Sequence, residues 1–218
     1  MEQSRVLVAG LGGVGSWCAE ALVRSGLGSI TIVDSDLVCE SNINRQLHST
    51  IRSLGRPKVE VMEERLKEIN PSCEVKSFHR VFSAETADIF DIPGMDYVID
   101  AIDTLTCKLD LIETALAAGK RLFSSMGMAG KLDPTLIKIA DIWDTAACPL
   151  AKLVRQGLLK RNILGHFTAV YSTEKFIRRE APEREGGKIV NGSAVTVTAA
   201  AGMVLASLVI RDICERHE

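Results

Sequence analysis

Residues 6–15 read VLVAGLGGVG, an apolar run followed at once by a glycine-rich turn. A helical pattern begins directly after it, over residues 14–25. Strand, glycine turn and helix in this order are typical of a phosphate-binding loop. Glycine lets the backbone approach a phosphate closely, and the helix presents unpaired N–H groups at its first turn. The stretch therefore predicts a nucleotide site built on Gly10, Gly12, Gly13 and Gly15.

The alternation of strands and helices continues along the chain. We expect strands at residues 5–9, 29–33, 74–78, 97–101, 121–125, 135–142 and 168–173, and helices at 14–25, 56–69, 84–90, 105–118, 150–159 and 194–213. Such alternation produces right-handed crossovers and a mostly parallel sheet. The predicted fold is α/β and Rossmann-like: a mostly parallel sheet flanked by helices, with extra C-terminal strands and a buried small-residue helix. Residues 178–187 read as a polar loop.

Composition narrows the class of protein. A chain of 218 residues with 46% hydrophobic content can bury one large core, so we expect a single domain. The net charge of −2 argues against a dedicated nucleic-acid or membrane binder. The six cysteines form no C-x-x-C pair, which favours reduced thiols over a zinc site. Without a signal pattern or a convincing membrane span, we expect a cytoplasmic protein that binds no membrane.

Acidic residues follow two of the predicted strands. Asp34 ends the second strand, 19 residues after Gly15, a spacing at which a carboxylate reaches ribose hydroxyls. Asp100 and Asp103 lie at the end of strand 97–101. Ligands of an open parallel sheet bind beyond the carboxyl ends of its strands. Up to this point an enzyme that uses NAD or FAD explains the pattern as well as an ATP-binding protein does.

A set of polar and cationic residues changes the preferred nucleotide. Asn42, Arg45, Gln46 and Lys58 follow Asp34 near the same edge of the sheet. Arginine binds phosphate oxygens as a fork and lysine binds them as a point charge. A dinucleotide does not require these extra cations, whereas a triphosphate uses them. Alone, either cation would read as a solvated surface charge, but the ordered set favours ATP.

At these residues the chain resembles the ThiF/MoeB/E1-like adenylating enzymes. The matching positions are Gly10, Gly12, Gly13, Gly15, Ser16, Asp34, Asp36, Asn42, Arg45, Gln46, Lys58, Asp100 and Asp103. Within that superfamily it looks most like the TcdA-type tRNA threonylcarbamoyladenosine dehydratases. That closer likeness lies in residues 44–48, 58–62, 69–71, 97–103 and 129–135.

The resemblance implies an ATP-dependent adenylation. The expected ATP-binding residues are Gly10, Gly12, Gly13, Gly15, Asp34, Asp36, Asn42, Arg45, Gln46 and Lys58. Arg45, Lys58 and Asp103 are the expected catalytic residues, with Mg²⁺ on Asp103. A substrate carboxylate would attack the α-phosphorus and form an acyl-adenylate. In the dehydratase branch this carboxylate belongs to threonylcarbamoyladenosine in tRNA, and ring closure then releases AMP.

The resemblance also implies an arrangement of the chain. Residues 1–126 would form the ATP-binding core of a single ThiF-type domain spanning residues 1–218. Residues 127–218 would supply the acceptor side and the dimerisation elements, with the helix at 194–213 packing in a homodimer. These enzymes usually carry, before the first strand, a helix whose arginine reaches the neighbouring subunit's ATP. Here only residues 1–4 precede Arg5, so we expect that arm to be missing or replaced.

Alternative functions remain open at this stage. The ThiF and MoeB branch adenylates the C-terminal glycine of a ubiquitin-like sulfur-carrier protein, and a sulfur-relay protein would then be a partner. That branch usually has two C-x-x-C pairs for zinc, and their absence here favours the dehydratases. A missing N-terminal arm instead favours a nucleotide-binding module with little turnover. A NAD-dependent dehydrogenase is the least favoured reading.

Several other residues have both a functional and an ordinary interpretation. Cys148 is either a sulfur-accepting thiol or, more simply, a packed or surface cysteine. His48 is either a substrate contact or an ordinary loop histidine. A group of positive charges is either a tRNA-backbone patch or a solvated helix face. It comprises Lys152, Arg155, Lys160, Arg161, Arg178 and Arg179.

Overall fold

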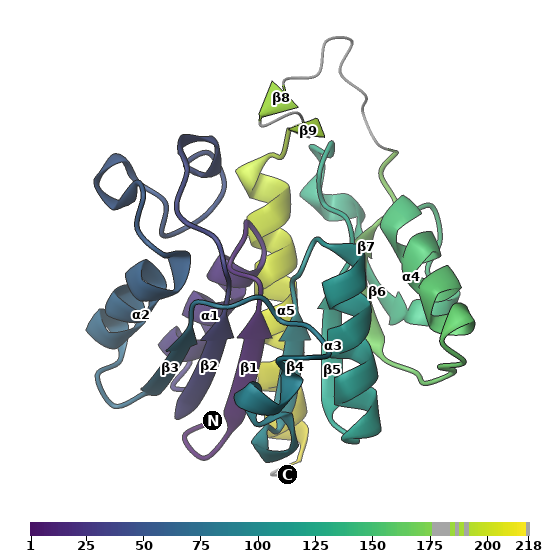
Figure 1. The fold of residues 1–218 in the computed structure, drawn as a ribbon, viewed down its shortest axis with the longest axis horizontal. Helices are drawn as coiled ribbons and strands as arrows, with labels where there is room; N and C mark the ends of the chain where they lie inside the picture. The colour runs from purple at the N-terminus through teal and green to yellow at the C-terminus, as the bar shows by residue number, and fades with distance from the viewer. Residues whose placement is uncertain (176–183, 186–187, 190–191, 217–218) are drawn as a thin grey trace.

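The computed structural model describes residues 1–175, 184–185, 188–189 and 192–216, and shows a seven-stranded sheet (Figure 1). The strands are β1 (Arg5–Ala9), β2 (Ser29–Val33), β3 (Glu74–Phe78), β4 (Tyr97–Asp100), β5 (Arg121–Ser125), β6 (Ile137–Asp141) and β7 (Thr168–Ser172). Their order is β3-β2-β1-β4-β5-β7-β6, and all neighbours are parallel except β6 and β7. The predicted Rossmann-like, mostly parallel sheet with extra C-terminal strands is confirmed.

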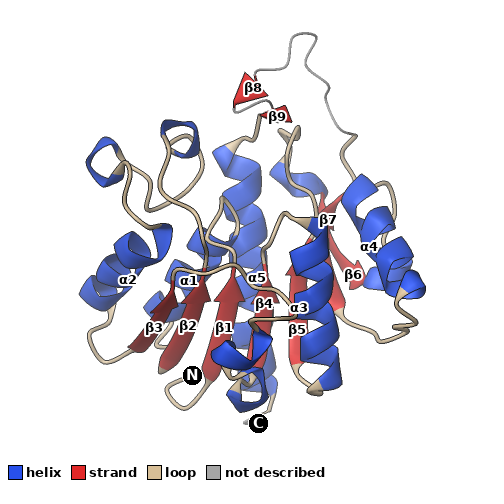
Figure 2. Ribbon diagram, in the orientation of Figure 1, coloured by secondary structure: helices blue, strands red, loops and turns tan. Residues whose placement is uncertain are grey.

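Helices lie on both faces of this sheet (Figure 2). They are α1 (Gly15–Arg24), α2 (Lys58–Ile69), α3 (Leu105–Ala117), α4 (Pro149–Lys160) and α5 (Val195–Glu215). A strand covered on both faces has no solvent side, so its sequence is apolar at consecutive positions. Strand β1 fits this rule, because four of its five residues are fully buried. The helices show a different pattern: their apolar residues recur at helical spacing, so each helix has one apolar side that can pack on the sheet.

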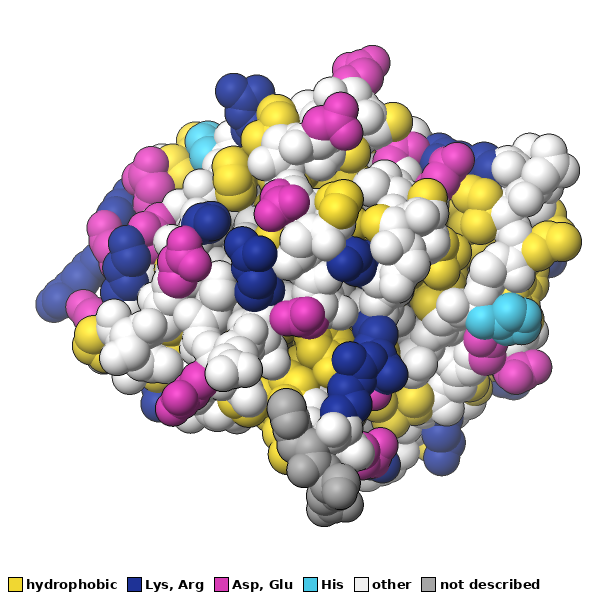
Figure 3. Space-filling model, turned by 90° about the horizontal axis from the view of Figure 1, so that it is seen from below, with side chains coloured by type: hydrophobic (Ala, Val, Ile, Leu, Met, Phe, Trp, Pro, Cys, Tyr) yellow, Lys and Arg dark blue, Asp and Glu magenta, His cyan; other side chains and the backbone are white. Residues whose placement is uncertain are grey.

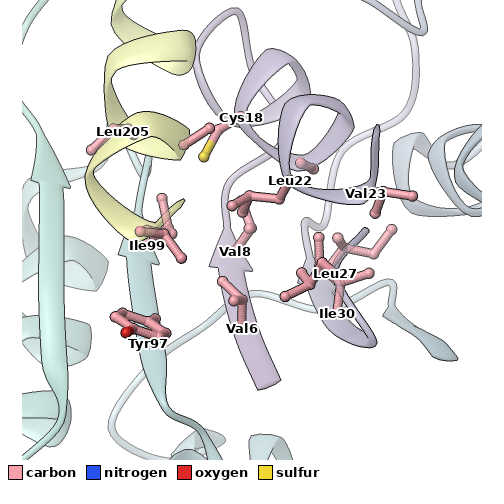
Figure 4. Packing of buried hydrophobic residues seen from close by; sticks show 14 of the residues in the cluster. Val6, Val8, Cys18, Leu22, Val23, Leu27, Ile30, Tyr97, Ile99 and Leu205 are labelled. Carbon is pink, nitrogen blue, oxygen red and sulfur yellow. The ribbon is translucent and has the colours of Figure 1, made fainter. Parts of the chain in front are cut away.

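Alternate residues of β1 point into two separate cores. Val6 and Val8 pack with Leu22 of α1 and Leu205 of α5 on one face (Figure 4). Leu7 belongs to the other core, which α3 and α4 cover. Burying such side chains contributes roughly 1.5–3 kcal/mol each. The fold is therefore a three-layer sandwich with the central strands at its middle.

Helix α5 is the small-residue helix expected near the C-terminus. Its buried face includes Ala201, Gly202 and Ala206, and it packs directly on α1. A Cβ on Gly202 would lie 2.9 Å from the Cβ of Trp17, so only glycine permits this approach. The other face is exposed and includes Met203, which is 45% exposed. By length and composition α5 is apolar enough to cross a membrane, but core helices pass the same test, so this is weak support for a span.

The C-terminal end of α5 is fastened to the amino ends of two strands. Tyr97 of β4 donates to Asp212 Oδ2 at 2.6 Å, and Arg121 of β5 forms an ion pair with the same carboxylate. Arg216 lies 3.1 Å from Asp212 and stacks over the Tyr97 ring. Figure 3 shows this end of the molecule, where basic and acidic side chains lie next to one another over much of the face.

Several predicted elements are shorter in the structure. The helix expected at 56–69 begins at Lys58, because Pro57 has an extended ψ of 131°. The helix expected at 84–90 is only a 3₁₀ turn over Ala87–Phe90, and Asp91 leaves it with a φ of +48°. The strand expected at 135–142 is confined to β6 by 3₁₀ turns on either side. Of the polar loop at 178–187, only 184–185 is described; it forms β8 (Arg184–Glu185), which pairs with β9 (Lys188–Ile189).

The strand order places a topological switch point at the carboxyl edge of the sheet. Strand β1 pairs with β2 on one side and with β4 on the other. The connections that leave β1 and β4 therefore run in opposite directions, and ligands of such sheets bind at this switch point. The glycine turn leaves β1, and the turn that carries Asp103 leaves β4.

Candidate active site

The glycine turn presents backbone at the switch point of the sheet. Gly10 has a φ of +90°, and a Cβ there would lie 2.6 Å from the carbonyl oxygen of Ala101. A side chain at Gly10 would therefore push the β1 and β4 turns apart. A Cβ on Gly12 would meet no atom within 4 Å, so Gly12 faces open space. The turn thus has a tight side toward the protein and an open side that a ligand can approach.

Asp34 ties the end of β2 to the glycine turn. Its Oδ2 accepts the Leu11 N–H at 2.6 Å, and its Oδ1 accepts the Asp36 N–H at 2.8 Å. Burial raises the pKa of this carboxyl, while the positive charge of Lys58 opposes the rise. The carboxylate is therefore held in one orientation beside the turn.

Lys58 joins the two acidic residues of this edge. It is the first residue of α2 and is 4% exposed. Its Nζ lies 2.7 Å from Asp36 Oδ2 and 3.9 Å from Asp34 Oδ1. The side chain of Asp36 is largely exposed, so the lysine can exchange that partner for another anion without breaking up a buried pair.

Arg45 lies against the glycine turn from the loop between β2 and α2. Its Cγ is 3.2 Å from the position that a Cβ on Gly13 would occupy. Its Nη1 donates to the Ser41 carbonyl at 2.7 Å and to Asn44 Oδ1 at 3.0 Å. The structure thus brings Arg45 and Lys58 to the same edge as Gly12, as expected for a phosphate site.

Asn42 and Gln46 are buried in the same loop. Asn42 Oδ1 accepts the Cys39 N–H at 3.1 Å and closes a turn of the loop. In the described part of the chain, all buried side-chain polar atoms without a partner come from Gln46, His48 and Ser49. Burial, followed by the positive charges of Lys58 and Arg65, lowers the pKa of His48 to about 4. His48 is therefore neutral near pH 7.

Asp103 stands on the exposed turn after β4. The Thr104 hydroxyl lies 3.4 Å from its Oδ1. Within the described ranges, no three His, Cys, Asp or Glu side chains form a group that could hold a metal ion. A single exposed carboxylate still suits Mg²⁺, which commonly takes one or two carboxylates together with substrate phosphates and water. The donor set therefore fits Mg²⁺ only when a phosphate ligand is present.

A buried ion pair behind Asp103 was not found by sequence reasoning. Lys108 Nζ lies 2.6 Å from Asp100 Oδ2 and 3.0 Å from the Ser125 carbonyl oxygen, and both charged side chains are fully buried. Asp100 Oδ1 also accepts the Ile102 N–H at 3.1 Å. The pair joins β4, β5 and the first turn of α3, and so shapes the turn of Asp103. The available signal was a lysine on the apolar face of a predicted helix.

The chain that carries these residues is similar to proteins of a known family. A model of the ThiF family matches residues 1–218. The chain belongs to the ThiF family. The tRNA threonylcarbamoyladenosine dehydratase of Bacillus subtilis (strain 168) is 41% identical over 228 residues, which cover 100% of this chain and 90% of that protein.

Other proteins match this ThiF-family chain over different shares of its length. The crystal structure of the E. coli tRNA N6-threonylcarbamoyladenosine dehydratase, TcdA, in complex with ATP matches with a TM-score of 0.89 at 34% identity, covering 99% of this chain and 88% of that chain. A probable molybdopterin-synthase adenylyltransferase of Porphyra purpurea is 34% identical over 121 residues, covering 55% of this chain and 31% of that protein. The resemblance to TcdA-type ThiF proteins is thus confirmed.

Two arginines of the predicted basic patch form ion pairs or hydrogen bonds within this ThiF-family chain. Arg161 pairs with Asp110 at 2.7 Å and with Glu113 at 2.8 Å. Arg155 donates to the Thr145 carbonyl at 3.1 Å. The exposed members are Lys152 and Lys160, whereas Arg178 and Arg179 lie outside the described residues.

Cys148 is buried directly before α4 and belongs to the core that α3 and α4 cover. Its packing agrees with the ordinary interpretation of this thiol.

Proposed function

We propose that this ThiF-family protein is an ATP-dependent enzyme that adenylates and then dehydrates threonylcarbamoyladenosine in tRNA. The observation that carries this proposal is the meeting of Gly12, Asp34, Arg45 and Lys58 at the switch point of the sheet. Its substrate is supported by the similarity to the Bacillus subtilis dehydratase, which covers 100% of this chain and 90% of that protein.

Each side chain of the site has a role in this reaction. Asp34 binds the ribose hydroxyls, since it is oriented beside the glycine turn. The triphosphate lies over Gly12, between Arg45 and Lys58. Lys58 exchanges Asp36 for phosphate oxygens when ATP binds. The net gain in binding free energy is therefore smaller than the lysine–phosphate attraction alone, because the ion pair with Asp36 is lost.

The reaction needs two steps. The substrate carboxylate attacks the α-phosphorus in line, an oxygen–phosphorus bond forms, and pyrophosphate leaves. A nucleophile of the same side chain then attacks the activated carbonyl, closes the ring and releases AMP. When bound at Asp103, Mg²⁺ would neutralise negative charge on the departing pyrophosphate. The protein contributes mainly positioning and electrostatic stabilisation, as expected for transfer at phosphorus.

The test is pyrophosphate release with defined acceptors. We expect release, and one AMP for each pyrophosphate, with tRNA that carries threonylcarbamoyladenosine, but not with the same tRNA lacking the modification. Release that depends instead on a small protein ending in Gly-Gly would contradict the proposed substrate. ATP binding without turnover on any of these acceptors would contradict the enzymatic role.

Adenylation of a ubiquitin-like sulfur carrier is the second candidate. It is supported by the similarity to the Porphyra purpurea protein, which covers only 55% of this chain. That alignment supports a shared nucleotide-binding core and gives little information about the substrate that accepts the adenylate. The tRNA substrate is preferred because the dehydratases match 99–100% of this chain and 88–90% of their own length.

A homodimer is part of the proposal. Two exposed apolar side chains support it: Met203 on α5, which is 45% exposed, and Ile139 on the edge strand β6, which is 48% exposed. Light scattering should give twice the 23.7 kDa mass of one chain. A monomer at micromolar concentration would contradict the proposal. Cytoplasmic localisation stays a prediction.

Arg45→Ala should weaken the binding of ATP much more than the binding of AMP. An arginine on the β- or γ-phosphate makes charged hydrogen bonds that AMP lacks, so we expect the Kd of ATP to rise about 10- to 100-fold. The Kd of AMP should change less than about twofold on the same reasoning. Calorimetry with both nucleotides measures this, with Arg52→Ala as control, because Arg52 is an exposed arginine of the same loop. Equal losses for ATP and AMP would place Arg45 away from these phosphates.

A further inference from the structure

The indole of Trp17 contacts the backbone of Arg45. Trp17 lies in the first turn of α1, and its Nε1 donates to the Arg45 carbonyl oxygen at 3.1 Å. On its other side, its Cβ approaches Gly202 of α5 so closely that a larger residue there would collide. Trp17 therefore connects α5 with the arginine loop, by which we mean residues 41–47.

The neighbouring residue Ser16 makes a second connection to the same loop. Its hydroxyl donates to the Gly12 carbonyl at 2.7 Å and accepts the Leu47 N–H at 3.3 Å. Ser16 is fully buried. Two consecutive side chains of α1 thus hold residues 45–47, and the same helix begins in the glycine turn. The glycine turn and the arginine loop are connected through one turn of one helix.

We propose that Trp17 is a positioning residue for Arg45. Its hydrogen bond fixes the Arg45 backbone at a set distance from the glycine turn, so that guanidinium and turn hold the same polyphosphate. Without this bond the loop would have to be ordered when the nucleotide binds, which lowers affinity. Because the bond is made to the backbone, it does not compete with the guanidinium for phosphate. The inference rests on the proposed function, in which ATP is the ligand.

Trp143 offers a matched control. Its Nε1 donates to the Gly165 carbonyl at 3.1 Å, the same kind of bond at the same length. It follows β6, whose last residue pairs with the first residue of β7, so it lies at the opposite edge of the sheet from the glycine turn. Trp17→Phe and Trp143→Phe therefore each remove one indole hydrogen bond, and only the first touches the arginine loop.

The experiment is nucleotide binding by calorimetry on the whole chain. We expect Trp17→Phe to raise the Kd of ATP about fivefold, as for one lost hydrogen bond, and to leave the Kd of AMP unchanged. Trp143→Phe should change neither. In the Arg45→Ala background, Trp17→Phe should add no further loss of ATP affinity, because both changes act through the same contact.

The outcomes that overturn the inference are distinct. ATP binding by Trp17→Phe equal to that of the unchanged protein, an equal loss for AMP, or a full loss in the Arg45→Ala background would each overturn it. If the unchanged protein bound no ATP, the proposed function would fail together with the inference. Should Trp17→Phe not fold, benzothienylalanine at position 17 keeps the ring shape, replaces the N–H by sulfur, and gives the same test.

Discussion

Replacing Asp103 with alanine is expected to lower the rate of Mg²⁺-dependent pyrophosphate release on the order of 10²–10³-fold, the loss typical of removing one preorganised electrostatic group. The side chain is exposed on the turn after β4, so the change should leave the fold intact. ATP affinity measured without Mg²⁺ should stay close to that of the unchanged protein. The rate is measured by a coupled pyrophosphate assay over a range of Mg²⁺ concentrations.

Two further variants make this result interpretable. Asp103→Asn keeps one oxygen but removes the negative charge, so it should lie between the alanine variant and the unchanged protein. Asp88→Ala removes an exposed carboxylate elsewhere on the surface and should have no effect. A rate for Asp103→Ala equal to that of Asp88→Ala would remove Asp103 from the mechanism.

Lys108→Met should destabilise the protein by about 3–5 kcal/mol, because it leaves the carboxylate of Asp100 buried without its charged partner. Both side chains of this pair are fully inaccessible, and the lysine also donates to the Ser125 carbonyl oxygen. The destabilisation should appear as a lower midpoint in urea unfolding at an unchanged slope.

The neutral double variant tests the reason for this loss. With Asp100→Asn added to Lys108→Met, no buried charge remains, so most of the lost stability should return. Lys160→Met, at an exposed position of α4, should change the free energy of unfolding by less than about 0.5 kcal/mol. If the double variant were as unstable as Lys108→Met, the unpaired charge would not be the cause.

Much of the fold follows from local pattern. The glycine turn after β1, and Asp34 at the end of β2, lie where the sequence alone predicts them. Strands and helices were recognised by apolar runs and apolar periodicity, which are properties of neighbouring residues. The errors are also local in origin. Pro57 delays the start of α2, and Asp91 with its positive φ ends the 3₁₀ turn that residues 84–90 had suggested as a helix.

Amino-acid sequence by itself determined the order of the elements, the glycine turn and the set of residues that we propose to bind a nucleotide. Only the tertiary structure decided which distant side chains support them. The Asp100–Lys108 pair depends on Ser124 and Ser125 of β5, and Trp17 reaches Arg45 across 28 residues. The physical reason is that periodicity reports which face of a segment is buried. A hydrogen bond between segments exists only once the sheet order has brought them together.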